Sequence, residues 1–135
     1  MGSFSDWCAD AVLKHVFKVA SMSVPTNLYV ALCKSTITDV KTGSTLPAEF
    51  SGGAYARKRC NTWTVSGTNP TRCENNMAIS YVEATAKWGT ATDFAVVTHS
   101  TTGQVVGYGK LTTPKKIGTG DTAKFSTGDI DADLD

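Results

Sequence analysis

The last sixteen residues, GDTAKFSTGDIDADLD (residues 120–135), give the clearest indication of the fold class. Glycine–aspartate pairs at 120–121 and 128–129 mark turns in front of two short runs. In the second run, aspartates at the odd positions from 129 to 135 alternate with Ile130, Ala132 and Leu134. A strict period of two is typical of a β-strand with one buried and one solvated face. We therefore expect the apolar side chains of this strand to point inward and its aspartates outward.

Other short runs with strand character recur along the chain between turn signals. They cover residues 27–33, 54–65, 77–84, 93–100 and 105–111. The last two are separated by a glycine-bearing loop and predict a hairpin, whereas residues 66–75 indicate a polar turn region. Many short strands with regular turns are typical of sandwiches and barrels. The sequence therefore predicts an all-β protein, a jelly-roll-like β-sandwich with one short N-terminal helix.

The helix is expected over residues 5–19, with Ser5 as its N-cap. Its apolar stripe recurs in steps of three and four, formed by Trp7, Cys8, Ala11, Val12, His15 and Val16. We expect residues 1–26 to form a helical arm and residues 27–135 to form the β-sandwich domain. Residues 34–53 form a long connection, rich in threonine, serine and glycine, that predicts a second arm or flap.

The composition narrows the possible partners. The chain has 135 residues and a formal net charge of +1, so it forms one domain and has no overall attraction for nucleic acid or an anionic membrane. No apolar run is long enough to span a bilayer, and the N-terminus lacks the pattern of a secretory signal. We expect a soluble protein made in a host cytoplasm, with neither nucleic acid nor membrane as its partner.

The stretch SGGAYARKRC (residues 51–60) combines two glycines with a basic run. A phosphate-binding loop would continue with Gly-Lys-Ser/Thr into a helix, and a dinucleotide fingerprint would need a third glycine. Neither pattern is present, so we interpret the glycines as a turn that leads into a strand. Arg57, Lys58 and Arg59 are then expected on the surface, where they could bind an acidic protein partner.

Nothing else in the sequence indicates catalysis, a metal or a cofactor. His15 and His99 have no neighbouring nucleophile motif, and alternating aspartates on a strand do not converge on a cation. The four cysteines form no Cys-x-x-Cys pair; Cys8 and Cys33 are interpreted as core residues, and a Cys60–Cys73 disulfide stays open. We therefore predict a protein that is not an enzyme, with no catalytic, metal-binding or cofactor-binding residues.

Several segments taken in order resemble a family of small structural proteins of tailed bacteriophages. They are FSDWCADAVLKHVFKVASMSVPTNLYVALCKS (4–35), SGGAYARKRC, AISYVEATAKWGTATDFAVV (78–97) and GYGKLTTPKKIGTGDTAKFSTGDIDADLD (107–135). The resemblance covers nearly the whole chain. Such proteins are often labelled tail-fibre proteins, and small β-sandwich proteins of phages also serve as capsid decoration (cement) proteins.

The resemblance implies a virion structural protein. Because the chain has no repetitive shaft and is one small module, we expect a cement protein on the capsid exterior that bridges subunits of the major capsid protein and associates with itself as a dimer or trimer. The alternative is a tail-fibre or spike module that binds a host-surface receptor. The expected partner-binding residues are Phe4, Trp7, Arg57, Lys58 and Arg59. The helix and residues 34–53 are expected to be arms that become ordered on binding.

Overall fold

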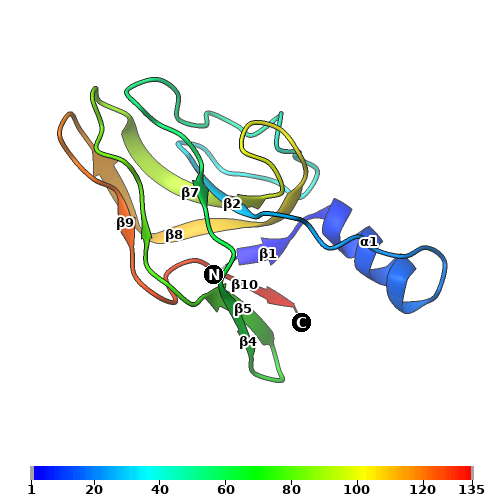
Figure 1. Ribbon diagram of the computed structural model, residues 1–135. Coiled ribbons are helices and arrows are strands. Elements are labelled where there is room, and N and C mark those ends of the chain that lie inside the picture. Colours follow the sequence, from blue (N-terminus) through cyan, green and yellow to red (C-terminus); the bar gives the residue numbers. More distant parts are fainter. Residues whose placement is uncertain (1, 135) are drawn as a thin grey trace.

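An antiparallel sheet of five strands runs through the centre of the molecule (Figure 1). The structure is a computed structural model that describes residues 2–134, and within them the chain forms ten strands and one helix. The elements are β1 (Gly2–Phe4), α1 (Asp6–Val16), β2 (Tyr29–Cys33), β3 (Lys58–Arg59), β4 (Trp63–Ser66), β5 (Thr71–Asn75), β6 (Ile79–Ser80), β7 (Gly89–Val97), β8 (Val105–Ile117), β9 (Lys124–Phe125) and β10 (Asp131–Leu134). The central sheet has the order β1-β8-β7-β2-β3, and all its pairings are antiparallel.

Both faces of the central sheet are buried, which explains the nearly continuous apolar sequence of β2. Val30 and Leu32 belong to a core cluster on one face, whereas Ala31 and Cys33 belong to a second cluster on the other face. Because side chains alternate along a strand, a sheet that is covered on both sides needs apolar residues at every position. β2 and the second half of β7 therefore lack the in–out alternation of a half-buried strand, whereas β8 alternates between buried and more exposed residues.

Two small sheets, β10-β5-β4 and β6-β9, cover the first face. Ile79, Phe125 and Ile130 come from this side and are almost fully buried in the larger core cluster. The connection between β2 and β3 covers the second face, where Ile37 is buried and Leu46 packs against the smaller cluster. Residues 34–53 thus contribute to the core, which differs from the expected free arm.

The fold class is confirmed at the level of an all-β protein with antiparallel sheets and one short N-terminal helix. The strand order does not show the expected jelly-roll arrangement. The expected hairpin is present as β7 and β8, although both strands extend beyond the predicted ranges. The division into residues 1–26 and 27–135 stays a prediction, and β1 within the first range pairs with β8.

The prediction of a polar turn region over residues 66–75 is wrong in its second half. β5 occupies Thr71–Asn75 and pairs with β4 on one side and β10 on the other. The reversal is confined to residues 67–70, where Gly67 has a φ of 79°. The sequence TRCEN has little strand propensity, so pairing with two neighbouring strands overrides the local preference.

The C-terminal alternation is also only partly correct. β10 is a strand, but Asp131 is buried and Leu134 is exposed. Arg72 on the paired strand β5 explains the inversion, because it donates two hydrogen bonds to Asp133 at 2.8 and 3.1 Å and lies 3.3 Å from Asp131. A carboxylate facing a guanidinium on the adjacent strand can lie inward at little cost. Asp135 lies outside the described residues.

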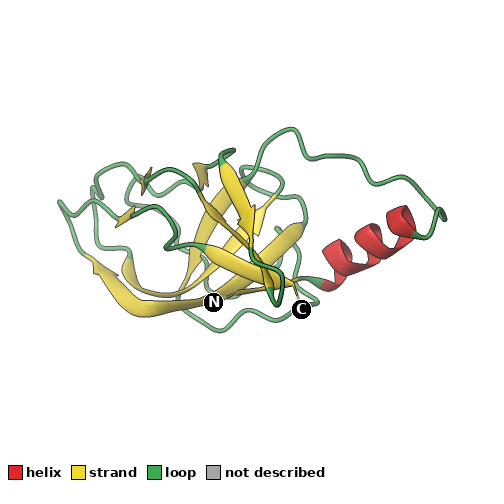
Figure 2. Ribbon diagram, turned by 90° about the horizontal axis from the view of Figure 1, so that it is seen from below, coloured by secondary structure: helices red, strands yellow, loops and turns green. Residues whose placement is uncertain are grey.

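α1 begins where the sequence predicts, because the Ser5 side chain accepts a hydrogen bond from the Cys8 N–H at 3.2 Å. The helix ends at Val16, three residues before the expected end, and Lys18 then adopts a left-handed φ of 62°. Its first turns lie against the β-body through Cys8, which is buried. The rest of α1 projects away from the strands (Figure 2).

Arg57 lies inside the molecule, which corrects its expected place on the surface. Its side chain is 3% exposed and forms a bidentate pair with Glu49, with two N–O distances of 2.8 Å. The other guanidinium N–H groups donate to the backbone carbonyls of Gly43, His99 and Thr102. All five donors of the guanidinium are therefore used within the chain.

These bonds join the connection after β2 to the loop between β7 and β8. The two loops also touch directly, since the Gly43 N–H donates to the Gly103 carbonyl at 2.9 Å. A side chain at Gly43 would place its Cβ 2.0 Å from the Thr102 carbonyl oxygen, so this approach requires glycine. Tyr55 donates a further hydrogen bond to Glu49 at 2.9 Å.

We expect Arg57→Met to destabilise the protein by about 3 kcal/mol, because it leaves Glu49 and three carbonyls without their buried partner. Arg57→Lys should also destabilise, since an ammonium cannot replace the planar fork. Urea denaturation followed by circular dichroism measures both changes. Lys58→Met, on the exposed neighbour, serves as the control and should change stability by less than about 0.5 kcal/mol. An Arg57→Lys variant as stable as the wild type would contradict the assigned role.

Candidate functional site

An irregularity in β8 forms one wall of a cleft on the described surface. Asp93 of β7 pairs with Lys110 of β8, but Ala91, two residues away, pairs with Lys115. Thr92 alone therefore stands opposite residues 111–114, and these leave the regular ladder. β-Bulges commonly occur beside functional sites, because they turn side chains and backbone groups away from the sheet.

The facing wall of the cleft is the turn between β9 and β10. Its N–H groups are held by side chains: Ser126 N–H donates to Asp129 Oδ2 at 2.7 Å, and Ile130 N–H donates to Asn75 Oδ1 at 3.0 Å. Asn75 is fully buried at the end of β5 and also donates to the carbonyls of Met77 and Ser126. This single amide fixes the position of the turn, with Gly128 (φ 85°) at its bend.

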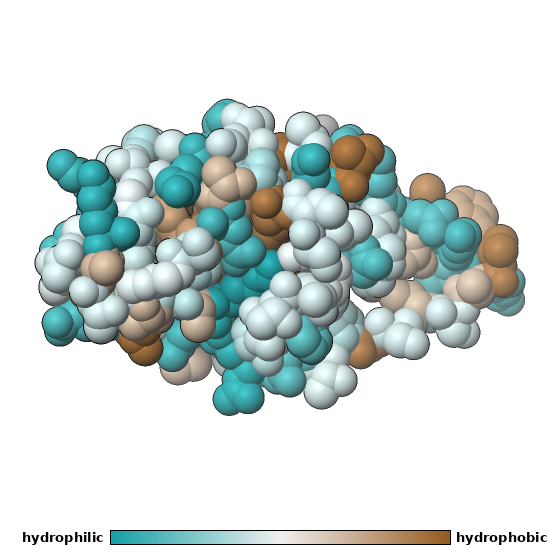
Figure 3. Space-filling model, turned by 90° about the horizontal axis from the view of Figure 1, so that it is seen from above, coloured by the Kyte–Doolittle hydropathy of each residue, from teal (hydrophilic) through white to brown (hydrophobic). Residues whose placement is uncertain are grey.

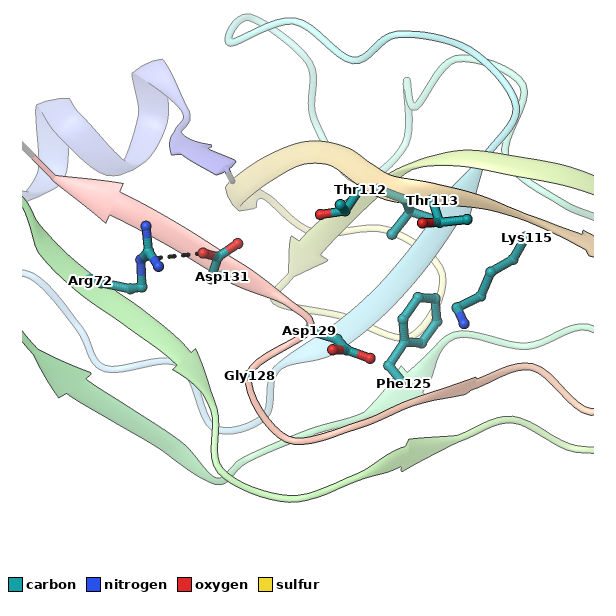
Figure 4. Close-up of a pocket in the computed structure, with 9 residues that line it drawn as sticks. Arg72, Thr112, Thr113, Lys115, Phe125, Gly128, Asp129 and Asp131 are labelled. Atoms are coloured by element: carbon teal, nitrogen blue, oxygen red, sulfur yellow. Dashed lines mark ion pairs between the residues drawn. The ribbon is translucent and has the colours of Figure 1, made fainter.

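The cleft between these walls has a volume of about 550 Å³ (Figure 4). Leu111, Thr112, Thr113 and Lys115 come from β8, and Phe125, Gly128, Asp129, Asp131 and Arg72 lie opposite or at its ends. It is lined mainly by hydroxyl, carboxylate and cationic groups over an aromatic base. This volume is of the size that a small organic ligand occupies.

Charges of both signs lie in the cleft. Arg72 is hydrogen-bonded to Asp133, which together with the nearby carboxylates raises the pKa of its guanidinium. The Lys115 ammonium lies 5.0 Å from the centre of the Phe125 ring, a cation–π geometry. Among residues 2–134, no carboxylate forms an ion pair with Lys115, so its donors are available to a ligand. A ligand with several hydroxyl groups matches this set of donors and acceptors.

Lys58 and Arg59 lie on β3, at the edge of the central sheet, and both are exposed. With Tyr29, Tyr81 and Val82 they line a separate hollow of about 360 Å³. Cationic side chains on an edge strand also prevent unwanted strand pairing, which gives them a structural role without a ligand. The expected basic run is thus divided, because Arg57 points inward and only its two neighbours face solvent.

Phe4 and Trp7, the expected apolar anchors, are both partly buried. Phe4 on β1 lines a small apolar hollow of about 180 Å³ together with Trp63 and Val106. Trp7 lies in the first turn of α1, next to the body. Their role as contacts to a partner stays a prediction. Neither residue lines the hollow that Lys58 and Arg59 line.

The described residues form no disulfide bond, no cluster of metal ligands and no membrane-spanning helix. None of the four cysteines, all within the described residues, forms a disulfide, and burial raises the pKa of Cys33 to about 12. In residues 2–134 no group of three potential ligands could hold a metal ion. The described helix is too short to cross a bilayer.

Sequence reasoning missed the cleft. One available signal was Pro114, because proline inside a strand is confined to edges and bulges. The size of the bulge and the buried position of Asn75 depend on pairings between distant segments, which the local sequence does not reveal.

The family of the chain is shown by comparison with known proteins. The family model described as "Podophage GP4 fiber I protein gp80" matches residues 3–133. The chain belongs to this family. No curated protein shows a significant match to it.

This membership confirms the suspected resemblance to tailed-phage structural proteins. The chain is a structural component of a phage virion and not an enzyme. Of the two roles considered, the description as a fibre protein supports the tail-fibre alternative better than capsid decoration. The major capsid protein as partner and a position on the capsid exterior stay predictions.

The pair between Arg72 and Asp133 at the cleft predicts a displaced titration. Hydrogen bonds from Arg72 lower the pKa of Asp133 below its ordinary value of 3.8. At a pH above 3.8, the ionised Asp133 carboxylate therefore stabilises the fold, and this contribution is lost as the pH falls through the lowered pKa. In the Arg72→Gln variant, the titration midpoint of Asp133 should rise toward 3.8, as measured by NMR titration of the Asp133 carboxyl carbon. Lys115→Met is the control, and an unchanged midpoint in Arg72→Gln would rule out the pairing.

Proposed function

We propose that this chain is a tail-fibre module that binds saccharides on the host-cell surface through the cleft between β8 and residues 125–131. The observation that carries the proposal is the match of nearly the whole chain, residues 3–133, to a family of podophage fibre proteins. Fibres are the virion parts that meet the cell, so a cleft on such a protein is a reasonable receptor site.

The chemistry of the cleft supports a saccharide over an apolar ligand. Thr112 and Thr113 carry hydroxyl groups, Asp129 and Asp131 carry carboxylates, and Lys115 carries an ammonium. Sugar hydroxyls donate to carboxylates and accept from cations and threonine hydroxyls. The smaller apolar hollow at Phe4 offers no comparable set of polar groups.

We also propose that Lys58 and Arg59 meet an acidic surface of a neighbouring virion protein. Both side chains are exposed on the edge strand, away from the cleft. Arg57 is left out of this contact, because its five donors are engaged within the chain. Receptor contact and attachment to the virion would then use different surfaces of the molecule.

The position in the virion is the first experiment. We expect few copies per particle, measured by gel densitometry against the major capsid protein, and antibody labelling at the tail in electron micrographs. Hundreds of copies that scale with the capsid subunits would contradict the fibre role and favour capsid decoration. The two roles differ in copy number because a decoration protein follows the symmetry of the shell.

Receptor binding is tested with the purified protein on an array of bacterial surface polysaccharides. We expect Thr113→Val and Lys115→Met each to weaken binding about tenfold, which corresponds to about 1.4 kcal/mol for one lost polar contact. Lys116→Met is the matched control, since Lys116 follows Lys115 on β8 but does not line the cleft. Equal losses in the control, or losses only in Lys58→Ala and Arg59→Ala, would refute the cleft as the binding site.

A further inference from the structure

The exposed side of α1 has its own apolar stripe. Leu13 is 57% exposed, Val16 63% and Phe17, the C-cap residue, 72%. With Ala9 these residues recur in steps of four, three and one, so they lie along one face of the helix. The body-facing side is a different one, formed by Trp7, Cys8, Ala11 and Val12. The sequence had predicted one stripe that included Val16, whereas the structure separates two.

The space-filling view shows apolar surface on the projecting end of the molecule (Figure 3). Val19 and Val24, in the segment that returns from α1 to β2, are also exposed and extend the apolar surface beyond the helix. A helix of 11 residues is marginal in water without a packed apolar face. A helix that is apolar on two sides is typically covered on both.

We propose that a second copy of this chain covers this stripe, with the two α1 helices packed antiparallel about a two-fold axis. The charges along α1 point to this partner and this direction. Asp6 and Asp10 lie in its N-terminal half, whereas Lys14 and Lys18 lie in or just after its last turn. Their order makes the helix acidic at one end and basic at the other.

The same four residues recur every fourth position, so they form one charged flank beside the apolar stripe. In an antiparallel pair, the same flank of each helix faces that of its partner, and the two residue sequences run in opposite directions. Asp6 and Asp10 of one copy then lie opposite Lys18 and Lys14 of the other. Asp10 and Lys14 already form an intrachain pair at 2.8 Å, with side chains 60% and 50% exposed, so both remain open to a second partner.

A parallel arrangement does not fit this pattern. In a parallel pair, the charged flank of one helix would meet the other flank of its partner helix. That other flank carries Cys8 and Val12 and faces the β-body. The helix dipoles also favour the antiparallel pair, because each N-terminus then lies beside a C-terminus. Two other titratable groups lie on or beside α1. His15 is in the last turn on the body side, and the Asp39 carbonyl accepts a hydrogen bond from the Asp6 N–H. Neither belongs to the charged flank, so its order of acidic and basic residues is unchanged.

Sedimentation equilibrium of the purified chain tests the proposal. We expect a concentration-dependent dimer, and Leu13→Glu combined with Val16→Glu should raise its dissociation constant about 100-fold or more. Both side chains are exposed in the single chain, so the variant should keep its fold, as checked by circular dichroism. Val65→Glu, at a 67% exposed valine on β4, is the matched control and should dimerise normally. A monomer at all concentrations, a trimer, or a dimer insensitive to the double variant would overturn the proposal.

The direction of the helices is tested by cross-linking. Ala9→Cys and Val16→Cys should form a disulfide with each other when mixed, and neither should cross-link efficiently with itself, because position 9 lies near position 16 only in an antiparallel pair. Cross-links within each variant alone would overturn the antiparallel arrangement. Thr113→Val and Lys115→Met should leave dimerisation unchanged, so this test is independent of receptor binding.

Discussion

The buried pair between Arg57 and Glu49 is the contact on which the long connection between β2 and β3 depends. A guanidinium with 3% exposure costs a large desolvation free energy unless every donor is used, and here all five are. Its acceptors come from the connection after β2 and from the loop between β7 and β8. The pair therefore holds a 24-residue connection (34–57) against the sheet, where Ile37 and Phe50 are buried. A loop of this length otherwise has few reasons to adopt one conformation.

The opposite face of the sheet is organised by a second polar residue. Asn75, at the end of β5, satisfies three backbone groups around the turn before β10. This turn and the bulge at residues 111–114 form the two walls of the cleft. The cleft therefore rests on a buried amide and on a break in the β7–β8 ladder. The receptor site that we propose would thus use walls positioned by hydrogen bonds within the chain.

The three surfaces of the molecule have different chemistry. The cleft is polar and contains both charges, the edge strand β3 is cationic, and the projecting helix α1 has an apolar face with an acidic and a basic end. In the proposed fibre role, ligand binding, attachment to the virion and pairing of copies would use these separate surfaces. The helix projects away from the strands (Figure 2), and no residue of α1 lines the cleft, so the proposed pairing would use a different surface.

Local sequence patterns determined the strands at the centre of the sheet, the start of α1 at Ser5 and the turn at Gly52 and Gly53, because hydrophobic periodicity, capping and positive φ act within a few residues. Together with the resemblance to phage structural proteins, they were enough for an all-β fold with one N-terminal helix and for a virion structural protein, but not for the strand order or for a fibre role over capsid decoration. Only the tertiary structure decided that Arg57 is buried, that TRCEN is a central strand of its small sheet and that Leu134 faces outward. Each of these outcomes depends on a partner distant in sequence: Glu49 and two loops for Arg57, β4 and β10 for β5, and Arg72 for the aspartates of β10. The energy of a buried charge or a strand pairing depends on what lies across the contact, and no short stretch of sequence contains that information.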